Sequence, residues 1–165
     1  MFKIWLQTLQ AVNNSILCLL ENPSDSTPFI TEFIRKFDET LIDRVRFQPF
    51  INNPYDSQRR GALMCNSILD SQIYNGHTTA GDALWGGVPI ITYGKDTEMS
   101  ARVGMSALYA LGLNKDLIVY SHEEYYNKAV TLGLNKKEYN RIRTKLVNTA
   151  YARPRNPFWD VRRYV

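Results

Sequence analysis

The sequence predicts an α/β domain in which a Rossmann-like open parallel sheet is flanked by helices. Short runs rich in branched apolar residues alternate with longer stretches whose apolar residues recur every three or four positions, which is the pattern of such a domain. At 165 residues, 44% of them hydrophobic, the chain has enough apolar material for one core. We therefore expect a single domain over 1–165, with its core over about 2–149 and a basic extension over 150–165.

The strand candidates are the five short apolar runs Ile16–Leu20, Arg44–Ile51, Ser67–Leu69, Pro89–Tyr93 and Leu117–Tyr120. A first helix carries the apolar stripe Trp5, Leu6, Leu9 and Val12. A second is expected to open at Thr27-Pro28, because proline is favoured in the first turn of a helix. Helical spacing predicts further helices over Thr79–Trp85, Met99–Leu111, Glu123–Leu132 and Lys136–Asn148. Gly112 and Gly133 follow two of these, and we expect both to adopt a left-handed cap.

The net charge is +4, and the basic excess lies at the end of the chain. Seven Lys and Arg residues follow residue 140, against one acidic residue. The aromatic residues between them fit no nucleic-acid-binding motif, so we expect no nucleic-acid partner and assign the tail a solvated or packing role. A domain that binds a partner through this tail stays open as an alternative. We expect residues 158–165 to pack back onto the domain or to lead into a further segment.

The sequence predicts neither a membrane anchor nor a metal site. No run of about 18 apolar residues is present, and the first 20 residues do not form a secretory signal. Cys18 and Cys65 each lie in an apolar segment, which predicts buried, reduced thiols and favours a cytoplasmic or nuclear compartment. His77 and His122 lie in unlike contexts, so the two histidines and two cysteines indicate no shared metal site.

The most informative stretch covers residues 69–89. It leaves a strand, passes through a polar turn and enters a helix at two threonines, and ligands of open α/β sheets lie outside the carboxyl ends of the strands. The first turn of a helix has unpaired N–H groups and partial positive charge, so Thr78, Thr79 and Ala80 can offer amides and hydroxyls to a diphosphate. Gly76 is expected to allow a tight turn and a close approach. These residues alone indicate a phosphate-binding α/β domain.

Two side chains of this stretch have two alternative roles each. Asp82 lies three residues after Thr79, which is the spacing of a reciprocal helix cap. Its carboxylate would otherwise accept hydrogen bonds from a ribose diol. His77 is either a bystander or, as a neutral imidazole beside a helix N-terminus, a donor of one hydrogen bond to a phosphate.

A longer string of motifs runs through this region: Asn75-Gly76-His77-Thr78-Thr79, then Asp82-Ala83-Leu84-Trp85, Gly87 and Pro89, and further on Ala101-Arg102-Val103, Ser106, Leu108 and Leu111-Gly112. This string resembles the C-terminal catalytic lobe of the protein O-GlcNAc transferases. The resemblance covers roughly residues 2–160. A string of this length is a specific signal.

The resemblance implies the C-terminal lobe of a two-lobed GT-B fold. It also implies transfer of N-acetylglucosamine from UDP-GlcNAc to serine or threonine hydroxyls of intracellular proteins, with inversion of the anomeric centre and with neither a metal nor another cofactor. By the same resemblance His77, Thr78 and Thr79 hold the diphosphate of the UDP-sugar, and Asp82 holds the ribose. Because no metal neutralises the leaving UDP, donors at the helix end must stabilise its charge.

The chain departs from the family on the uridine and sugar sides. The loop over 50–58 lacks the family's lysine and histidine. Tyr55 is the candidate to stack on uracil, with Arg59 or Arg60 nearby, and an ordinary surface tyrosine is the alternative. Tyr74 takes a place near the sugar where many relatives have a smaller residue, which leaves another donor sugar, such as fucose, open.

Lys95 and Arg102 are further candidates for the phosphate side, with structural salt bridges as the alternative. The sequence begins with a helix where a doubly wound sheet has a strand, and it contains neither the partner lobe nor the tetratricopeptide repeats of the family. We therefore expect a fragment that binds the nucleotide but does not transfer sugar alone, with the catalytic groups and the contacts to acceptor proteins supplied by the rest of the enzyme. A degenerate, non-catalytic binding module stays open as the alternative.

Overall fold

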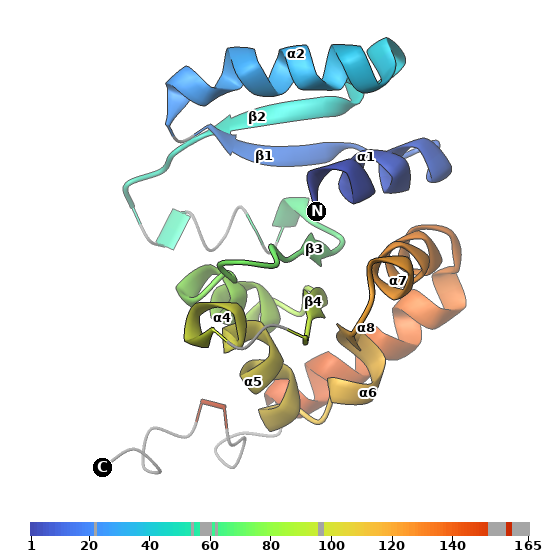
Figure 1. Ribbon diagram of the computed structural model, residues 1–165. Helices are drawn as coiled ribbons and strands as arrows, with labels where there is room; N and C mark the ends of the chain where they lie inside the picture. The colour runs from blue at the N-terminus through green and yellow to red at the C-terminus, as the bar shows by residue number, and fades with distance from the viewer. Residues whose placement is uncertain are drawn as a thin grey trace.

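The computed structural model describes residues 1–21, 23–53, 55–56, 61, 63–95, 98–151 and 158–159, and it contains two parallel sheets with helices on their faces (Figure 1). In the first sheet, β1 (Leu17–Glu21) pairs with β2 (Val45–Pro49) along its whole length. In the second, the order is β3 (Ile68–Leu69), β4 (Ile90–Tyr93) and β5 (Ile118–Val119). All of these pairings are parallel, as the α/β pattern predicts.

The five predicted strands are all present, but the single open sheet that we expected is divided into two ladders. β3 is only two residues long. The N–H groups of Ile68 and Asp70 donate to the carbonyls of Pro89 and Ile91, at 2.9 and 3.1 Å, so they are used on the β4 side. A strand of two residues offers few backbone groups for a second ladder on the β1 side.

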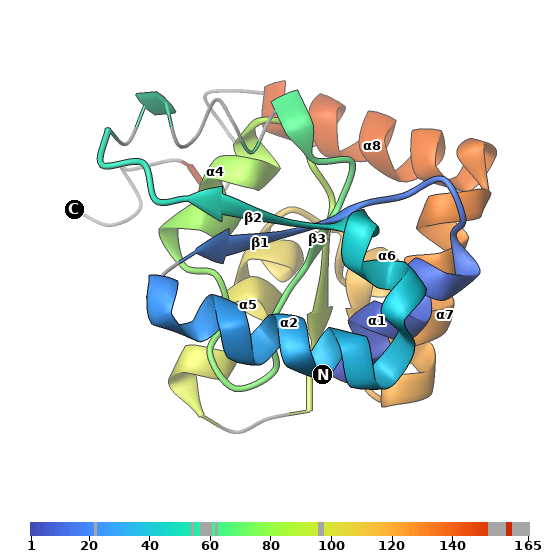
Figure 2. The same ribbon diagram turned by 90° about the horizontal axis from the view of Figure 1, so that it is seen from above.

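The helices are α1 (Phe2–Ala11), α2 (Thr27–Asp38), α4 (Thr78–Trp85), α5 (Val103–Ala110), α6 (Asn114–Leu117), α7 (His122–Leu134) and α8 (Lys136–Tyr151), with 3-10 turns over Ser24–Ser26, Glu39–Arg44 and Met99–Ala101. In both views α4 and α5 lie on one side of the second sheet and α7 lies on the other (Figures 1 and 2). The helix expected over Met99–Leu111 is broken at Arg102, whose backbone (φ −114°, ψ 0°) lies outside the helical range. The short α6 was not predicted, because four residues carry too little periodicity.

Helix α1 is shared between two hydrophobic clusters, which explains its apolar stripe. Leu6 and Leu9 join Ile34 in the cluster between α1, α2 and the first sheet. Ile4 belongs instead to the larger cluster around the second sheet. On that side Trp5 Nε1 donates to the hydroxyl of Tyr125 in α7, at 3.3 Å. The apolar residues of α1 are therefore buried on two sides of the helix, one against each cluster.

Arg44 closes the C-terminal end of α1. We expected this residue to begin a strand, but it ends the 3-10 turn before β2. Its guanidinium donates to the carbonyls of Leu9 and Val12, both at 2.6 Å, and to that of Ser15, at 3.1 Å. The last carbonyls of a helix have no partner within the helix, and a cation there also favours the helix dipole. Arg44 therefore fixes the first sheet to α1.

The two expected glycine caps have different outcomes. Gly112 has φ of +68°, which confirms the left-handed cap. Gly133 lies inside α7 and the expectation for it is wrong, because the helix continues to Leu134. A Cβ at Gly133 would lie 2.7 Å from Cγ2 of Val12, so its lack of a side chain lets α7 approach the end of α1.

Cys18 and Cys65 form no disulfide, as predicted, but both are only half-buried. The expectation of full burial is therefore wrong. None of the described helices has the length and the apolar character that are needed to cross a membrane.

The contact at Gly133 gives a test of the fold. Gly133→Ala should lower the free energy of unfolding by about 1–2 kcal/mol, since the overpacking against Val12 outweighs the helix propensity that alanine gains. Asn127→Ala, at an exposed position of the same helix, is the matched control and should leave stability unchanged or slightly raised. Urea unfolding of both variants checks this, and a stabilised Gly133→Ala variant would contradict the packing.

Candidate functional site

A loop over residues 70–77 joins the end of β3 to the start of α4 and is the centre of the candidate site. Asp70 follows β3 directly, and α4 begins at Thr78. Asp70 and Asn75 are buried, whereas His77 and Thr78 are exposed. The loop therefore has an inner face that anchors it and an outer face that is available to a ligand, at the carboxyl end of the strand where α/β domains bind ligands.

Asp70 is the anchor of the inner face, with 4% of its surface exposed. Oδ1 accepts hydrogen bonds from the N–H groups of Gly76, at 2.8 Å, and Ser71, at 3.1 Å. Oδ2 accepts a short hydrogen bond from the hydroxyl of Thr92 in β4. Burial raises the pKa of the Asp70 carboxyl, although these hydrogen bonds and the nearby His77 act in the opposite direction.

Asn75 is the second anchor. Its Nδ2 donates to the carbonyl of Ser71 at 2.8 Å, and its Oδ1 accepts from the N–H of Gly104 at 3.0 Å. Its own N–H donates to the carbonyl of Ser100 at 2.9 Å. Asn75 thereby ties the loop to the 3-10 turn and to α5, and this explains structurally why an asparagine stands before Gly76.

Tyr125 supports the loop from the side of α7. Its hydroxyl donates to the carbonyl of Asp70 at 2.8 Å and accepts from Trp5 Nε1. Desolvation in this buried place raises the pKa of Tyr125 far above its usual value, so the hydroxyl stays a donor. Asp70 is therefore connected through Tyr125 to α1 as well as through Thr92 to β4.

His77 and Tyr74 stand together on the outer face. Their rings are stacked, with centroids 4.6 Å apart and planes inclined by 11°. The Nε2 of His77 lies 3.4 Å from the carbonyl of Ser100, and the hydroxyl of Ser71 donates to the carbonyl of Tyr74. Tyr74 is 63% exposed, so the stack is held by the loop rather than by burial. The imidazole of His77 is thus oriented on one face by an aromatic ring.

The first turn of α4 is suited to an anion. The N-cap residue is His77, which makes no side-chain cap hydrogen bond. Thr79 is consequently the second residue of the helix, and the reciprocal cap that we considered for Thr79 and Asp82 is wrong, because that motif needs the threonine at the N-cap itself. Thr78 and Thr79 are exposed at this helix end. The first-turn amides of α4, which carry the positive end of the helix dipole, thus receive no side-chain cap from His77.

Gly76 is needed for close approach rather than for a left-handed turn. Its φ is not positive, in contrast to Gly87 and Gly112. A Cβ at Gly76 would lie 2.9 Å from Oγ1 of Thr79 and 3.4 Å from the amide nitrogen of Ala80. The absence of a side chain at Gly76 therefore lets the loop pass close to the first turn of α4.

A groove of about 490 Å³ runs along α4 from this helix end. It is lined by His77, Thr78, Gly81, Asp82, Trp85, Phe158 and Trp159. Two residues of the C-terminal extension form its aromatic wall: Phe158 lies 3.8 Å from the place of a Cβ on Gly81, and the ring of Trp159 stands edge-on to Trp85 at 5.2 Å. The expectation that the chain packs back onto the domain is confirmed for these two residues.

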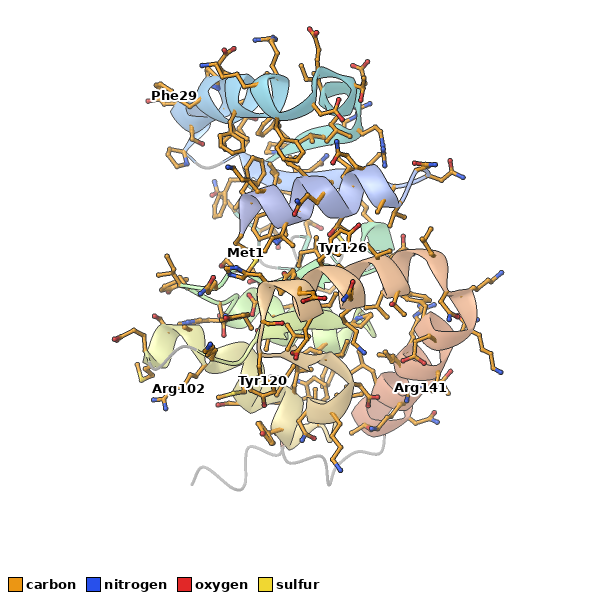
Figure 3. The ribbon with its side chains drawn as sticks, turned by 45° about the vertical axis from the view of Figure 1, so that its right-hand side comes forward. Met1, Phe29, Arg102, Tyr120, Tyr126 and Arg141 are labelled. Atoms are coloured by element: carbon orange, nitrogen blue, oxygen red, sulfur yellow. The ribbon has the colours of Figure 1, made fainter. Side chains whose placement is uncertain are left out.

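The other predicted residues either do not line this groove or lie outside the described part of the chain. Tyr55 is described and 70% exposed, with its N–H bonded to Oδ1 of Asn53 at 3.0 Å. Arg59 and Arg60 lie outside the described residues. Lys95 and Arg102 are both exposed, and Figure 3 labels Arg102. Among the described residues, no ion pair involves either of them.

Several supporting residues were not identified from the sequence. Asp70, Thr92, Gly104 and Tyr125 come from separate elements, and they meet only in the folded chain. The available signal was an aspartate directly after a strand and six residues before a glycine. No group of three or more His, Cys, Asp or Glu side chains that could hold a metal ion is present in the part of the chain that the structure describes.

The parallel α/β topology, with a polar loop that leads into a helix at the carboxyl end of a strand, defines the class: an α/β domain of the kind that binds ligands at this edge. The family can also be stated. The family model described as glycosyl transferase family 41 matches residues 1–165, so the chain belongs to this family.

Relatives and a solved structure agree with this assignment. A probable UDP-N-acetylglucosamine–peptide N-acetylglucosaminyltransferase SEC of Arabidopsis thaliana is 34% identical over 98% of this chain and 16% of that protein. A UDP-N-acetylglucosamine–peptide N-acetylglucosaminyltransferase of Caenorhabditis elegans is 35% identical over 98% of the chain and 13% of that protein. The chain thus spans about a seventh of these relatives.

The solved structure of a mutant O-GlcNAc transferase from Thermobaculum terrenum matches with a TM-score of 0.75 and 24% identity, over 98% of this chain and 31% of that chain. This likeness confirms the expected fold, a lobe of a GT-B glycosyltransferase.

Gly104 offers a test of the anchored loop. A Cβ at this position would lie 2.5 Å from Oγ1 of Thr92 and 2.7 Å from Oδ2 of Asp70. Gly104→Ala should therefore lower the free energy of unfolding by about 1–3 kcal/mol, although alanine is the better helix former. Ser106→Ala, exposed on the same helix, is the control. Thermal unfolding of the two variants compares them, and equal midpoints would show that the loop is not packed as described.

Proposed function

We propose that this chain is the UDP-sugar-binding part of a protein O-linked N-acetylglucosaminyltransferase, which transfers GlcNAc from UDP-GlcNAc to serine or threonine side chains. The observation that carries the proposal is the first turn of α4, which has no side-chain cap from His77 and is held open beside Gly76 at the carboxyl end of β3. Such a helix end binds phosphate through its amides and its dipole. Two relatives named for this activity support the choice of donor.

The lining of the groove supports a division of roles. His77, Thr78 and Thr79 stand at the helix end, where they would donate to the diphosphate. Asp82 lies one turn further along the same groove, and its carboxylate would accept hydrogen bonds from the ribose hydroxyls. Tyr74 would lie on the sugar side through its stack with His77. Tyr55 and Arg60 remain proposed contacts of the uracil.

The role of these residues in the reaction is to hold charge. In an inverting transfer, the acceptor oxygen attacks the anomeric carbon from the face opposite UDP, the acceptor proton goes to a base, and the bond from the anomeric carbon to the UDP oxygen breaks. Donors fixed around the leaving diphosphate lower the barrier, because the negative charge there grows in the transition state. We propose that the base and the acceptor site come from the rest of the enzyme, which acts in the cytoplasm or the nucleus.

Nucleotide titration tests the proposal. The 165-residue chain should bind UDP saturably, and Thr78→Ala combined with Thr79→Ala should weaken binding about tenfold or more, because each hydroxyl donates to a charged oxygen. Thr144→Ala, exposed on α8, is the matched control and should leave the affinity unchanged. Calorimetry measures both. No saturable UDP response would favour the degenerate module, and a preference for GDP would favour a fucosyl donor.

The role of Asp82 has its own test. Asp82→Asn should weaken UDP binding and reduce the preference for UDP over 2′-deoxy-UDP, because a carboxylate that accepts from the ribose diol distinguishes the two nucleotides. An equal loss of affinity for both nucleotides would assign Asp82 to another contact.

Metal dependence is a further test. Addition of EDTA should leave UDP binding unchanged, since the proposed donors act without a metal bridge. The chain alone should also show no sugar transfer from UDP-GlcNAc to a serine-containing peptide. Loss of UDP binding in EDTA, or turnover by the isolated chain, would contradict these parts of the proposal.

A further inference from the structure

The carboxylate of Asp70 lies under the loop that leads from β3 to α4 but outside the groove along α4. The residue is 4% exposed and does not line the cavity along α4. A ligand in this groove is therefore not in contact with Asp70 itself.

Both ends of the loop meet at one oxygen of this carboxylate. Oδ1 accepts from the N–H of Ser71 at 3.1 Å and from that of Gly76 at 2.8 Å, so it fixes the first residue of the loop and the residue before His77. Oδ2 is bonded to Thr92 of β4, which fixes the carboxylate itself relative to the sheet. An ionised carboxylate accepts all of these bonds, whereas an amide of the same shape has only one accepting oxygen.

We propose that Asp70 is a positioning residue of the donor site, whose buried carboxylate fixes the backbone of residues 71–77 so that His77 and Thr78 meet the diphosphate without rearrangement. This inference rests on the proposed function. A loop that is ordered before the ligand arrives avoids the entropy loss of ordering on binding, so its anchor contributes to affinity without touching the ligand.

The energetics distinguish this role from ordinary core packing. Burial raises the pKa of Asp70 in the folded chain. A group of this kind contributes stability that is complete below its unfolded pKa and is lost as the pH rises through its folded pKa. A neutral amide of the same shape avoids the desolvation cost of the carboxylate but loses one of its two accepting oxygens, so the two effects on stability oppose each other. A positioning role accordingly predicts a loss of affinity that is much larger than the change in stability.

The experiment compares Asp70→Asn with Asp43→Asn, an exposed aspartate in the 3-10 turn before β2. Asp70→Asn should bind UDP about tenfold or more weakly, while its thermal midpoint changes little, and Asp43→Asn should change neither quantity. Unchanged UDP affinity in Asp70→Asn overturns the inference while the proposed function stands. A parallel loss of affinity and thermal stability also overturns it, since core packing then explains the effect.

A second pair of variants keeps the test independent of the Asp70 substitution. Thr92→Ser retains the hydroxyl that fixes the carboxylate and should keep the affinity, whereas Thr92→Val removes it at equal size and should lower the affinity.

The amide proton of Gly76, observed by NMR without ligand, should move upfield in Asp70→Asn. An unmoved Gly76 resonance overturns the inference. Absence of UDP binding by the unmodified chain overturns the proposed function instead, and the Gly76 resonance then still reports on the loop.

Discussion

A carboxylate buried beneath a loop must find hydrogen-bond donors, and this requirement organises the second half of the molecule. The donors to Asp70 come from Thr92 in β4 and from the backbone of its own loop, while its carbonyl accepts from Tyr125 in α7. Gly104 in α5 must lack a side chain for the same carboxylate to fit. One charged group thus determines how a strand, a loop and two helices meet.

This arrangement separates the support of the site from its chemistry. The groups beneath the loop are buried and bonded to one another, whereas His77, Thr78 and Thr79 are exposed on its other face. The outer residues can therefore be specialised for a ligand without changing the core beneath them. The aromatic wall formed by Phe158 and Trp159 adds a third part to the groove, supplied by a segment far away in the sequence.

Elements whose periodicity is local could be predicted from the sequence, and features that depend on distant partners could not. The strands, the stripe of α1 and the loop before α4 follow from alternation of apolar runs, helical spacing and a polar turn. Asp70 gives no such signal, because its partners lie up to 55 residues away. Gly133 was misjudged for the same reason: its conformation is helical, and the glycine is needed by Val12 on another helix.

Helix α1 faces one hydrophobic cluster with Leu6 and Leu9 and the other with Ile4. Arg44 fixes it to the first sheet, and the bond from Trp5 to Tyr125 fixes it to the second. A helix that both clusters need makes their unfolding cooperative, because neither can open without exposing apolar surface of the other. A mechanical linkage results: α1 connects the first sheet, through Trp5 and Tyr125, to the carbonyl of Asp70 at the start of the loop before α4.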